Sequence, residues 1–264
     1  MHRPTAAPLA VSLALALTGT VPGGARAATV DRRPLSVAAA ASLRPAMEDL
    51  ARAFEAAEPG VEVRLTFGAS GAFFAQLQSG APFDAFFSAD RDYPRRLVDE
   101  GLGDAEVVYA VGRLVIWVPA GSPLDVARLG LAALAAPAAR KIAIANPALA
   151  PYGRAAEAAL RSAGIYDAVK GRLVLGESVA QAAQFAQSGA ADAALLPASL
   201  TKLPALAGGT AAPIPPQARA RLEHSAVVLR SARDPALARA FLALVLGPKG
   251  REILRRHAYD LPVD

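Results

Sequence analysis

The 264-residue chain contains no cysteine and only three histidines, and aromatic residues make up just 6% of the sequence. Without cysteine it can form no disulfide, and it has no thiolate to act as a nucleophile or as a metal ligand. His224 and His257 have no partner at the spacing of a metal site or a catalytic triad. These absences argue against cysteine chemistry, a histidine-based metal centre and histidine-dependent catalysis.

Strong charge and long apolar runs are also lacking. The formal net charge is +5, and no basic block or aromatic-interleaved basic stripe accompanies it. We therefore expect no binding to nucleic acid. After residue 27, no apolar run is long and uninterrupted enough to supply the about 20 residues that a membrane-spanning helix needs.

Residues 1–27 have the pattern of a cleavable export signal. Arg3 provides a positive start, residues 9–17 are an apolar run, and residues 25–27 form a small-x-small cleavage site. We expect the mature chain to begin at Ala28 and to be periplasmic, without a lipid anchor because no cysteine can carry one. A signal-anchor is the alternative, and the Pro-Gly-Gly sequence at 22–24 argues against it.

Short apolar strand patterns alternate with amphipathic helical patterns through most of the chain, which predicts an α/β fold. A segment rich in proline and glycine, residues 203–217, is expected to be a loop. The expected strands are residues 35–40, 61–67, 84–88, 107–110, 114–118, 142–145, 173–175, 193–196 and 226–229. The expected helices are residues 43–57, 71–78, 91–100, 129–135, 153–163, 179–188, 235–246 and 248–257.

This order of elements predicts two α/β lobes, the second inserted into the first. Residues 28–110 and 221–264 would form the first lobe and residues 111–220 the second. Each lobe would be a mostly parallel sheet flanked by helices. The chain would cross between the lobes near residues 108–113 and 219–225. A cleft between two lobes is a frequent site for a small ligand.

Four strand-to-helix turns carry residues suited to an anion. Ser42 follows the first apolar strand and precedes a helix, and Ser70, Tyr152 and the pair Ser178–Val179 stand at corresponding turns. The first N–H groups of a helix have no partner within it, and the helix dipole favours negative charge there. Ligands of open parallel sheets lie beyond the carboxyl ends of the strands. The pattern predicts an anion site made of uncharged donors.

Each of these residues also has a purely structural interpretation. Ser42 and Ser178 are typical helix N-caps, and Ser70 between glycines is typical of a turn. Tyr152 is compatible with surface packing at a helix start, and Val179 would act through its backbone alone.

Other polar residues favour structural roles. Asp84 and Asp90 suit strand ends and helix caps, and their carboxylates would repel an anion. Arg44 and Arg154 follow the proposed donors and are expected on solvated helix faces, although either could add positive potential at the rim of the cleft. Trp117, in an apolar strand, is expected in the core.

Five segments, in order along the chain, resemble the periplasmic molybdate-binding protein of ABC importers, and together they span nearly the whole mature chain. They are residues 39–43, 67–71, 80–90, 146–153 and 176–179. The resemblance implies a type II periplasmic-binding-protein fold with the oxyanion in the cleft between two lobes. It further implies capture of molybdate, delivery to an ABC importer permease in the inner membrane, no cofactor, no enzymatic activity and a monomeric protein.

The resemblance also implies which residues hold the ligand. Ser42 and Ser70 would give hydroxyl and backbone donors from the first lobe, and the backbone N–H groups of Tyr152 and Val179 would come from the second. All four would contact oxygen atoms of the oxyanion and would not be ligands of the metal. Some members have a ligand-contacting tyrosine where this chain has Pro197, which offers neither hydroxyl nor N–H. That contact is absent or replaced, and Tyr152 is the obvious substitute.

Other functions remain open from the sequence alone. Tungstate is nearly the same size as molybdate and is expected to bind as well. Sulfate or phosphonate would suit a similar set of helix starts. A periplasmic serine hydrolase with Ser42 or Ser70 as nucleophile is an alternative, but no Gly-x-Ser-x-Gly motif and no base in the strand-end turns supports it.

Overall fold

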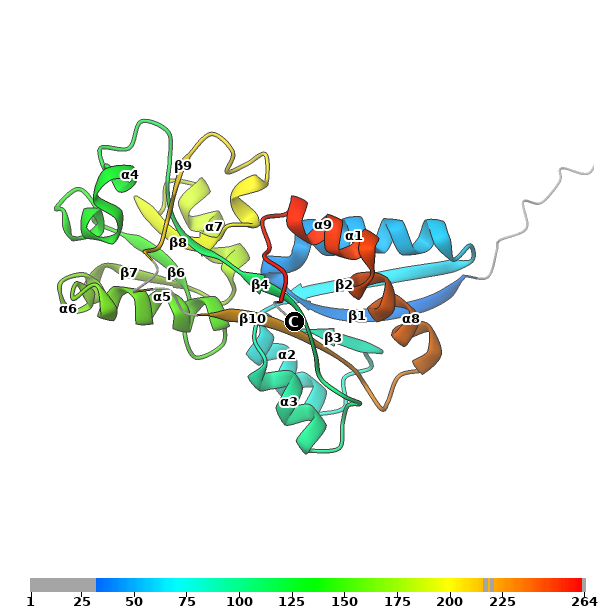
Figure 1. Cartoon of the computed structure of the whole chain (residues 1–264). Helices are drawn as coiled ribbons and strands as arrows, with labels where there is room; N and C mark the ends of the chain where they lie inside the picture. Colours follow the sequence, from blue (N-terminus) through cyan, green and yellow to red (C-terminus); the bar gives the residue numbers. More distant parts are fainter. Residues whose placement is uncertain (1–31, 216–217, 219–220, 263–264) are drawn as a thin grey trace, which may run out of the picture. The chain divides into compact units, whose positions relative to one another are not determined.

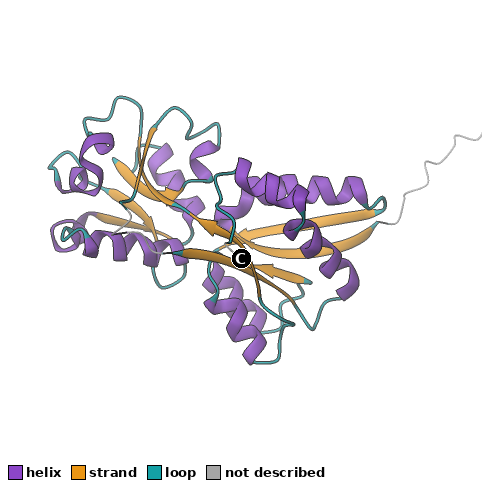
Figure 2. Ribbon diagram, in the orientation of Figure 1, coloured by secondary structure: helices purple, strands orange, loops and turns teal. Residues whose placement is uncertain are grey.

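The computed structural model of this protein describes residues 32–215, 218 and 221–262. The expected export signal, residues 1–27, lies outside the described residues. Within the described part, the strands form two five-stranded sheets, each accompanied by helices (Figure 1, Figure 2). No helix in this part combines the length and the apolar character that crossing a bilayer demands.

The first sheet has the strand order β2-β1-β3-β10-β4. β1 runs parallel to β2 and β3, whereas β10 runs antiparallel to β3 and β4. The strands are β1 (Arg33–Ala40), β2 (Val61–Gly68), β3 (Ala85–Phe87), β4 (Val107–Gly112) and β10 (Leu222–Val228). The helices are α1 (Arg44–Ala57), α2 (Ser70–Gln78), α3 (Asp92–Asp99), α8 (Pro235–Leu246) and α9 (Pro248–Arg256).

Both faces of this sheet are buried, and the alternation of side chains along each strand explains how. Val37 and Ala39 of β1 pack in one apolar cluster with Met47 of α1 and Phe241 of α8. Ala38, between them, packs in a second cluster with the phenylalanines of α2. The sheet is therefore sandwiched between α1, α8 and α9 on one face and α2 and α3 on the other.

The second sheet has the order β7-β6-β8-β5-β9. β6 runs parallel to β7 and β8, whereas β5 runs antiparallel to β8 and β9. The strands are β5 (Leu114–Val118), β6 (Ile142–Ala145), β7 (Leu173–Gly176), β8 (Ala193–Pro197) and β9 (Thr210–Pro213). The helices are α4 (Val126–Leu129), α5 (Pro151–Ser162), α6 (Tyr166–Val169) and α7 (Val179–Gln187).

The chain passes from the first sheet to the second directly from β4 into β5, and it returns from β9 to β10. β4 and β10 are neighbours at one side of the first sheet. The expected lobe boundaries, at residues 110/111 and 220/221, stay a prediction; β4 itself extends to Gly112, and residues 219–220 lie outside the described part.

The structure differs from the expected elements in several places: α6 was not expected, and β10 begins at Leu222 and not at residue 226. The expected loop 203–217 contains β9, a short strand on the edge of β5 in which Ala211 pairs with Trp117. Trp117 is buried, as expected, and its indole N–H donates to the carbonyl oxygen of Leu206 at 3.0 Å. The expected helix 129–135 is instead α4 followed by the 3-10 helix η2 (Gly130–Ala135), because Gly130 has a positive φ of 55° that breaks the α-helix. The other 3-10 helices are η1 (Ala41–Leu43), η3 (Lys170–Arg172) and η4 (Leu200–Lys202).

Asp84 joins distant segments of the first sheet, which agrees with the structural role expected for it. Its side chain is 3% exposed, and its carboxylate accepts from the N–H groups of Ser36 and Arg233, both at 2.7 Å.

Asp84→Ala would leave two N–H groups without an acceptor, so we predict a loss of about 2–4 kcal/mol in the free energy of unfolding. Urea denaturation measures this, and Asp99→Ala, on the exposed side of α3, is the matched control. A loss no greater than that of the control would contradict the structural role.

Candidate functional site

Four helix starts meet at one small cavity of about 10 Å³. They belong to η1, which continues into α1, and to α2, α5 and α7. Each follows the carboxyl end of a strand, β1 and β2 in the first sheet and β6 and β7 in the second. The lining residues are Ala40, Ala41, Ser42, Gly68, Ala69, Ser70, Ala89, Ala150, Pro151, Tyr152 and Val179. All four site residues expected from the sequence, Ser42, Ser70, Tyr152 and Val179, are among them.

The two serines are buried and do not cap their helices. Ser42 and Ser70 are each 1% exposed, and the N-cap positions of η1 and α2 are Ala40 and Ala69. The N-cap interpretation of Ser42 is therefore wrong. The Ser70 hydroxyl accepts from the Ala89 N–H at 3.1 Å. Since a hydroxyl has one proton to give and two lone pairs, Ser70 can still donate its proton to a ligand.

Tyr152 lies at the second position of α5, behind Pro151. Its side chain is 2% exposed, so surface packing does not describe it. Its hydroxyl is buried without a hydrogen-bond partner among the described residues, which is unusual for a buried polar group. This oxygen lies against the backbone of Gly112, where an added Cβ would come within 2.0 Å of it. Burial raises the pKa of the Tyr152 phenol well above its usual value, so the group is a neutral donor.

Val179 is the first residue of α7, and the helix is capped as expected. Ser178 is the N-cap, and its hydroxyl accepts from the N–H of Gln181 at 3.4 Å. The Ser178 oxygen is thus engaged within its own helix, while Val179 lines the cavity. Pro197 is buried at the end of β8, paired with Leu114, and is not part of the cavity lining.

No lining residue of the small cavity carries a charge. Hydroxyl protons and the N–H groups of helix starts can only donate, so the cavity suits a guest that offers acceptors. The described residues also contain no group of three or more histidine, aspartate or glutamate side chains placed to hold a metal ion.

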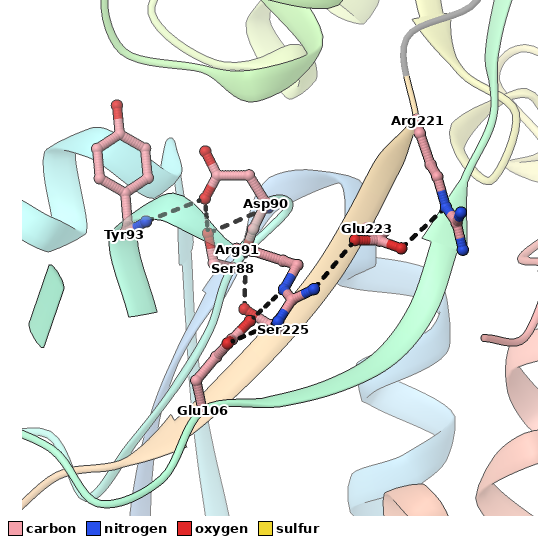
Figure 3. A network of polar contacts seen from close by, with 8 residues as sticks. All are labelled: Ser88, Asp90, Arg91, Tyr93, Glu106, Arg221, Glu223 and Ser225. Carbon is pink, nitrogen blue, oxygen red and sulfur yellow. Dashed lines mark hydrogen bonds and ion pairs between the residues drawn. The ribbon is translucent and has the colours of Figure 1, made fainter. Parts of the chain in front are cut away.

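A larger cavity, of about 410 Å³, adjoins Pro151 and has a different character. Arginines and carboxylates line it together: Asp90, Arg91, Asp92, Arg95, Arg154, Arg221 and Glu223. Figure 3 shows how several of them are paired: the Arg91 guanidinium donates to Glu106 at 2.8 Å and to Glu223 at 3.5 Å. An anion there would face carboxylates as well as arginines, so the small uncharged cavity is the better anion site.

Arg154 connects the two sheets, whereas the sequence favoured a solvated helix face and left a place at the rim of the cleft as the alternative. From α5, its guanidinium donates to the Asp90 carboxylate at 2.5 Å and to the Tyr93 hydroxyl at 3.2 Å. Asp90 in turn accepts from the N–H of Tyr93 at the start of α3, consistent with the expected capping role. Close by, the Gly71 N–H of α2 donates to the carbonyl oxygen of Leu149 at 2.9 Å. Arg44, by contrast, is half exposed, with its guanidinium 4.2 Å from the centre of the Phe67 ring.

The structure places three further residues beside Ser42 that the sequence analysis did not assign to the site. The Ser42 carbonyl oxygen accepts from the Ser199 hydroxyl at 2.8 Å and from the Tyr259 hydroxyl at 2.7 Å. The Ser42 hydroxyl lies 3.5 Å from Nε2 of His224. Residues 42 and 224 are 182 positions apart, so no motif spacing could have paired them.

The sequence matches the family of bacterial extracellular solute-binding proteins over residues 35–260. The chain belongs to this family. It is 36% identical to the molybdate-binding protein ModA of Azotobacter vinelandii, over 90% of this chain and 94% of that protein. It is 34% identical to ModA of Rhodobacter capsulatus, over 76% of this chain and 78% of that protein. The resemblance to the molybdate-binding proteins is thereby confirmed.

Solved structures of solute-binding proteins have the same fold. The periplasmic molybdate-binding protein of Azotobacter vinelandii superposes with a TM-score of 0.79 at 32% identity, covering 87% of this chain and 100% of that one. The sulfate-binding protein SubI of Mycobacterium tuberculosis has a TM-score of 0.76 at 18% identity, covering 88% and 87%. At that identity the likeness concerns the fold alone. The expected two-lobed type II fold is confirmed, with two mixed sheets.

The Arg154–Asp90 ion pair should hold the two halves of this solute-binding protein together. Arg154→Gln removes a partly exposed pair worth about 1 kcal/mol. We predict that the Gly71 amide, which donates across the same contact, then exchanges its hydrogen about fivefold faster. Amide exchange followed by NMR measures the rate. Arg161→Gln is the control, because Arg161 pairs with Glu157 within α5. Equal rates in both variants would show that the pair does not join the halves.

Proposed function

We propose that this protein captures molybdate in the periplasm and delivers it to the permease of an ABC importer. The observation that carries this proposal is the uncharged cavity at which four helix starts from two sheets meet. The molybdate-binding names of the relatives support the choice of ligand. In this assignment Ser42, Ser70, Tyr152 and Val179 contact the oxygen atoms of the oxyanion, and residues 28–110 with 221–264 and residues 111–220 form the two lobes.

The chemistry of the donors suits a tetrahedral dianion. Molybdate offers only acceptor oxygens, so every hydroxyl and N–H of the cavity can donate to it. Hydrogen bonds to a charged group contribute about 1.5–3 kcal/mol each. Several such bonds would hold the ion tightly, while the absence of a lining cation lets it leave when the lobes separate. The ligand would contact both lobes together only in the closed form. Its binding would therefore raise the population of the closed form relative to the open one.

Selectivity would come from size and from protonation. Tungstate is nearly as large as molybdate, so we expect it to bind as well. Sulfate is smaller and would leave some donors too far from its oxygens, and each unmatched polar group in a dry site costs about 1–3 kcal/mol. Phosphate usually carries a proton, which only the lone pairs of the cavity's hydroxyls could accept. A preference for sulfate or phosphonate is the alternative that a titration decides.

A serine hydrolase is the less favoured alternative, although the structure does bring His224 within reach of Ser42. Burial lowers the pKa of the His224 imidazole to about 4, which makes it a poor base near neutral pH. Its Nδ1 faces the carbonyl oxygen of Leu222 at 3.0 Å, where a catalytic triad has a carboxylate. We therefore propose a binding protein without enzymatic activity, without a cofactor and acting as a monomer. Export through the signal at residues 1–27 would place it in the periplasm without a lipid anchor.

Calorimetric titration with molybdate, tungstate and sulfate tests the ligand directly. We predict that molybdate and tungstate bind at least about 100-fold more tightly than sulfate, since two or more donors would lose their partner in the smaller ion. Ser70→Ala should lower the molybdate affinity about 10- to 100-fold by removing one charge-assisted bond. Ser79→Ala, in the exposed hydroxyl that follows α2, is the matched control. Equal affinity for sulfate would refute the assignment of molybdate.

The unpartnered hydroxyl of Tyr152 gives a second test. If it replaces the tyrosine contact that is missing at Pro197, Tyr152→Phe should weaken molybdate binding about tenfold or more. The same substitution should leave the free energy of unfolding unchanged or higher, because a buried hydroxyl without a partner is removed. Titration and urea denaturation of one variant measure both effects. Unchanged affinity would limit the contact of Tyr152 to its backbone N–H.

A further inference from the structure

His224 lies directly behind Ser42, which is a proposed ligand contact. It is fully buried on β10, where the register of the sheet shifts between His224 and Ser225. A bulge of this kind re-aims a side chain. Nε2 of its ring lies 3.5 Å from the Ser42 hydroxyl oxygen.

The hydrogen bonds of the ring determine its tautomer. Nδ1 lies 3.0 Å from the carbonyl oxygen of Leu222. A carbonyl can only accept, so the hydrogen of the neutral ring is on Nδ1, and Nε2 is a bare acceptor. The acceptor nitrogen therefore faces the Ser42 hydroxyl, which has a single proton to donate.

The groups around His224 stay neutral or ion-paired, which leaves its imidazole as the group that changes charge as the pH falls. Three tyrosine rings pack edge-on against it from β4, α5 and the segment after α9: Tyr109, Tyr152 and Tyr259. Burial raises the pKa of all three phenols, that of Tyr259 to about 12, so they stay neutral. On its own strand, Glu223 is held by ion pairs with Arg91 and Arg221.

An oxyanion in the cavity competes with His224 for the Ser42 proton. If Ser42 donates to the ligand, its oxygen lone pairs face the lone pair of Nε2, which is unfavourable. A proton on Nε2 removes this conflict, since the imidazolium then donates to the Ser42 oxygen. It also places a positive charge behind a doubly negative ligand, in a site where burial strengthens the attraction.

We propose that His224 is a positioning residue that switches the Ser42 hydroxyl between two partners and couples oxyanion binding to the uptake of one proton. In the empty site, Ser42 donates to neutral His224. In the occupied site, Ser42 donates to the oxyanion, and His224 takes a proton from solvent and donates to Ser42. This inference rests on the proposed function, because it requires a dianion at Ser42.

The sign of the resulting pH dependence follows from the proton balance. The ligand-free pKa of His224 is about 4, and a bound dianion raises it. Between the two pKa values the complex holds one more proton than the free protein, so affinity rises as pH falls, by up to about tenfold per pH unit. Above the pKa of the complex the dependence disappears.

Proton uptake is measured by titrating molybdate into the full protein at mildly acidic pH in two buffers of different ionisation enthalpy. We expect the binding heat of the unmodified protein to depend on the buffer, with tungstate as a second probe giving the same result. His224→Gln should bind with a heat independent of the buffer and with a flat pH profile. His257→Gln, on the ring that pairs with Asp49, should keep the dependence of the unmodified protein.

Binding with no buffer dependence in the unmodified protein would overturn this proposal alone, and so would uptake that persists in His224→Gln. Absence of any binding heat would overturn the proposed function as well, so the two failures are distinguishable. NMR of the His224 ring nitrogens in the unmodified protein gives a second readout, which does not depend on the variant folding. Nε2 should be unprotonated without molybdate and protonated with it, and an Nε2 that stays unprotonated in the complex would contradict the proposal.

Discussion

A buried hydrogen-bond donor needs an acceptor, and this requirement applies above all to the helix starts around the small cavity. Parallel pairing of β1 with β2 and of β6 with β7 sends the helix starts that follow them to a common place. Ser42 and Ser70 add hydroxyls to the free N–H groups there, and no cation takes part in the lining. In the proposed function, a guest rich in acceptors would complete the hydrogen bonds of these buried helix starts.

Ser42 links this cavity to the contact between the two sheets. Its carbonyl oxygen is held by Ser199, which follows β8 of the second sheet, and by Tyr259, which follows α9. Ser42 also lines the cavity, and its hydroxyl lies 3.5 Å from Nε2 of His224. A movement of one half relative to the other would therefore alter the contacts of Ser42, the residue that is proposed to touch the ligand. In the proposed function, binding and closure would share these contacts, so a ligand would stabilise the closed form.

The prediction from sequence was accurate where local pattern decides structure. The strands predicted at 114–118 and 142–145 have the same bounds in the structure, because each is a fully buried apolar run that ends at a turn. β9 was missed because Thr210–Pro213 has no apolar alternation and becomes a strand only by pairing with β5. The four cavity residues were found because a strand followed by a helix start has a local signature. His224, Ser199 and Tyr259 were not, since their contacts with Ser42 join residues far apart in the chain.

The sequence by itself determined the α/β alternation, the helix starts at Ser42, Ser70, Tyr152 and Val179, and the resemblance to molybdate-binding proteins, because all of these depend on neighbouring residues. Only the tertiary structure decided that the hydroxyl of Tyr152 is buried without a partner among the described residues, that Arg154 reaches Asp90, and that His224 faces Ser42. These features arise where two sheets meet. Side-chain directions there follow from packing between distant segments, which no local pattern encodes.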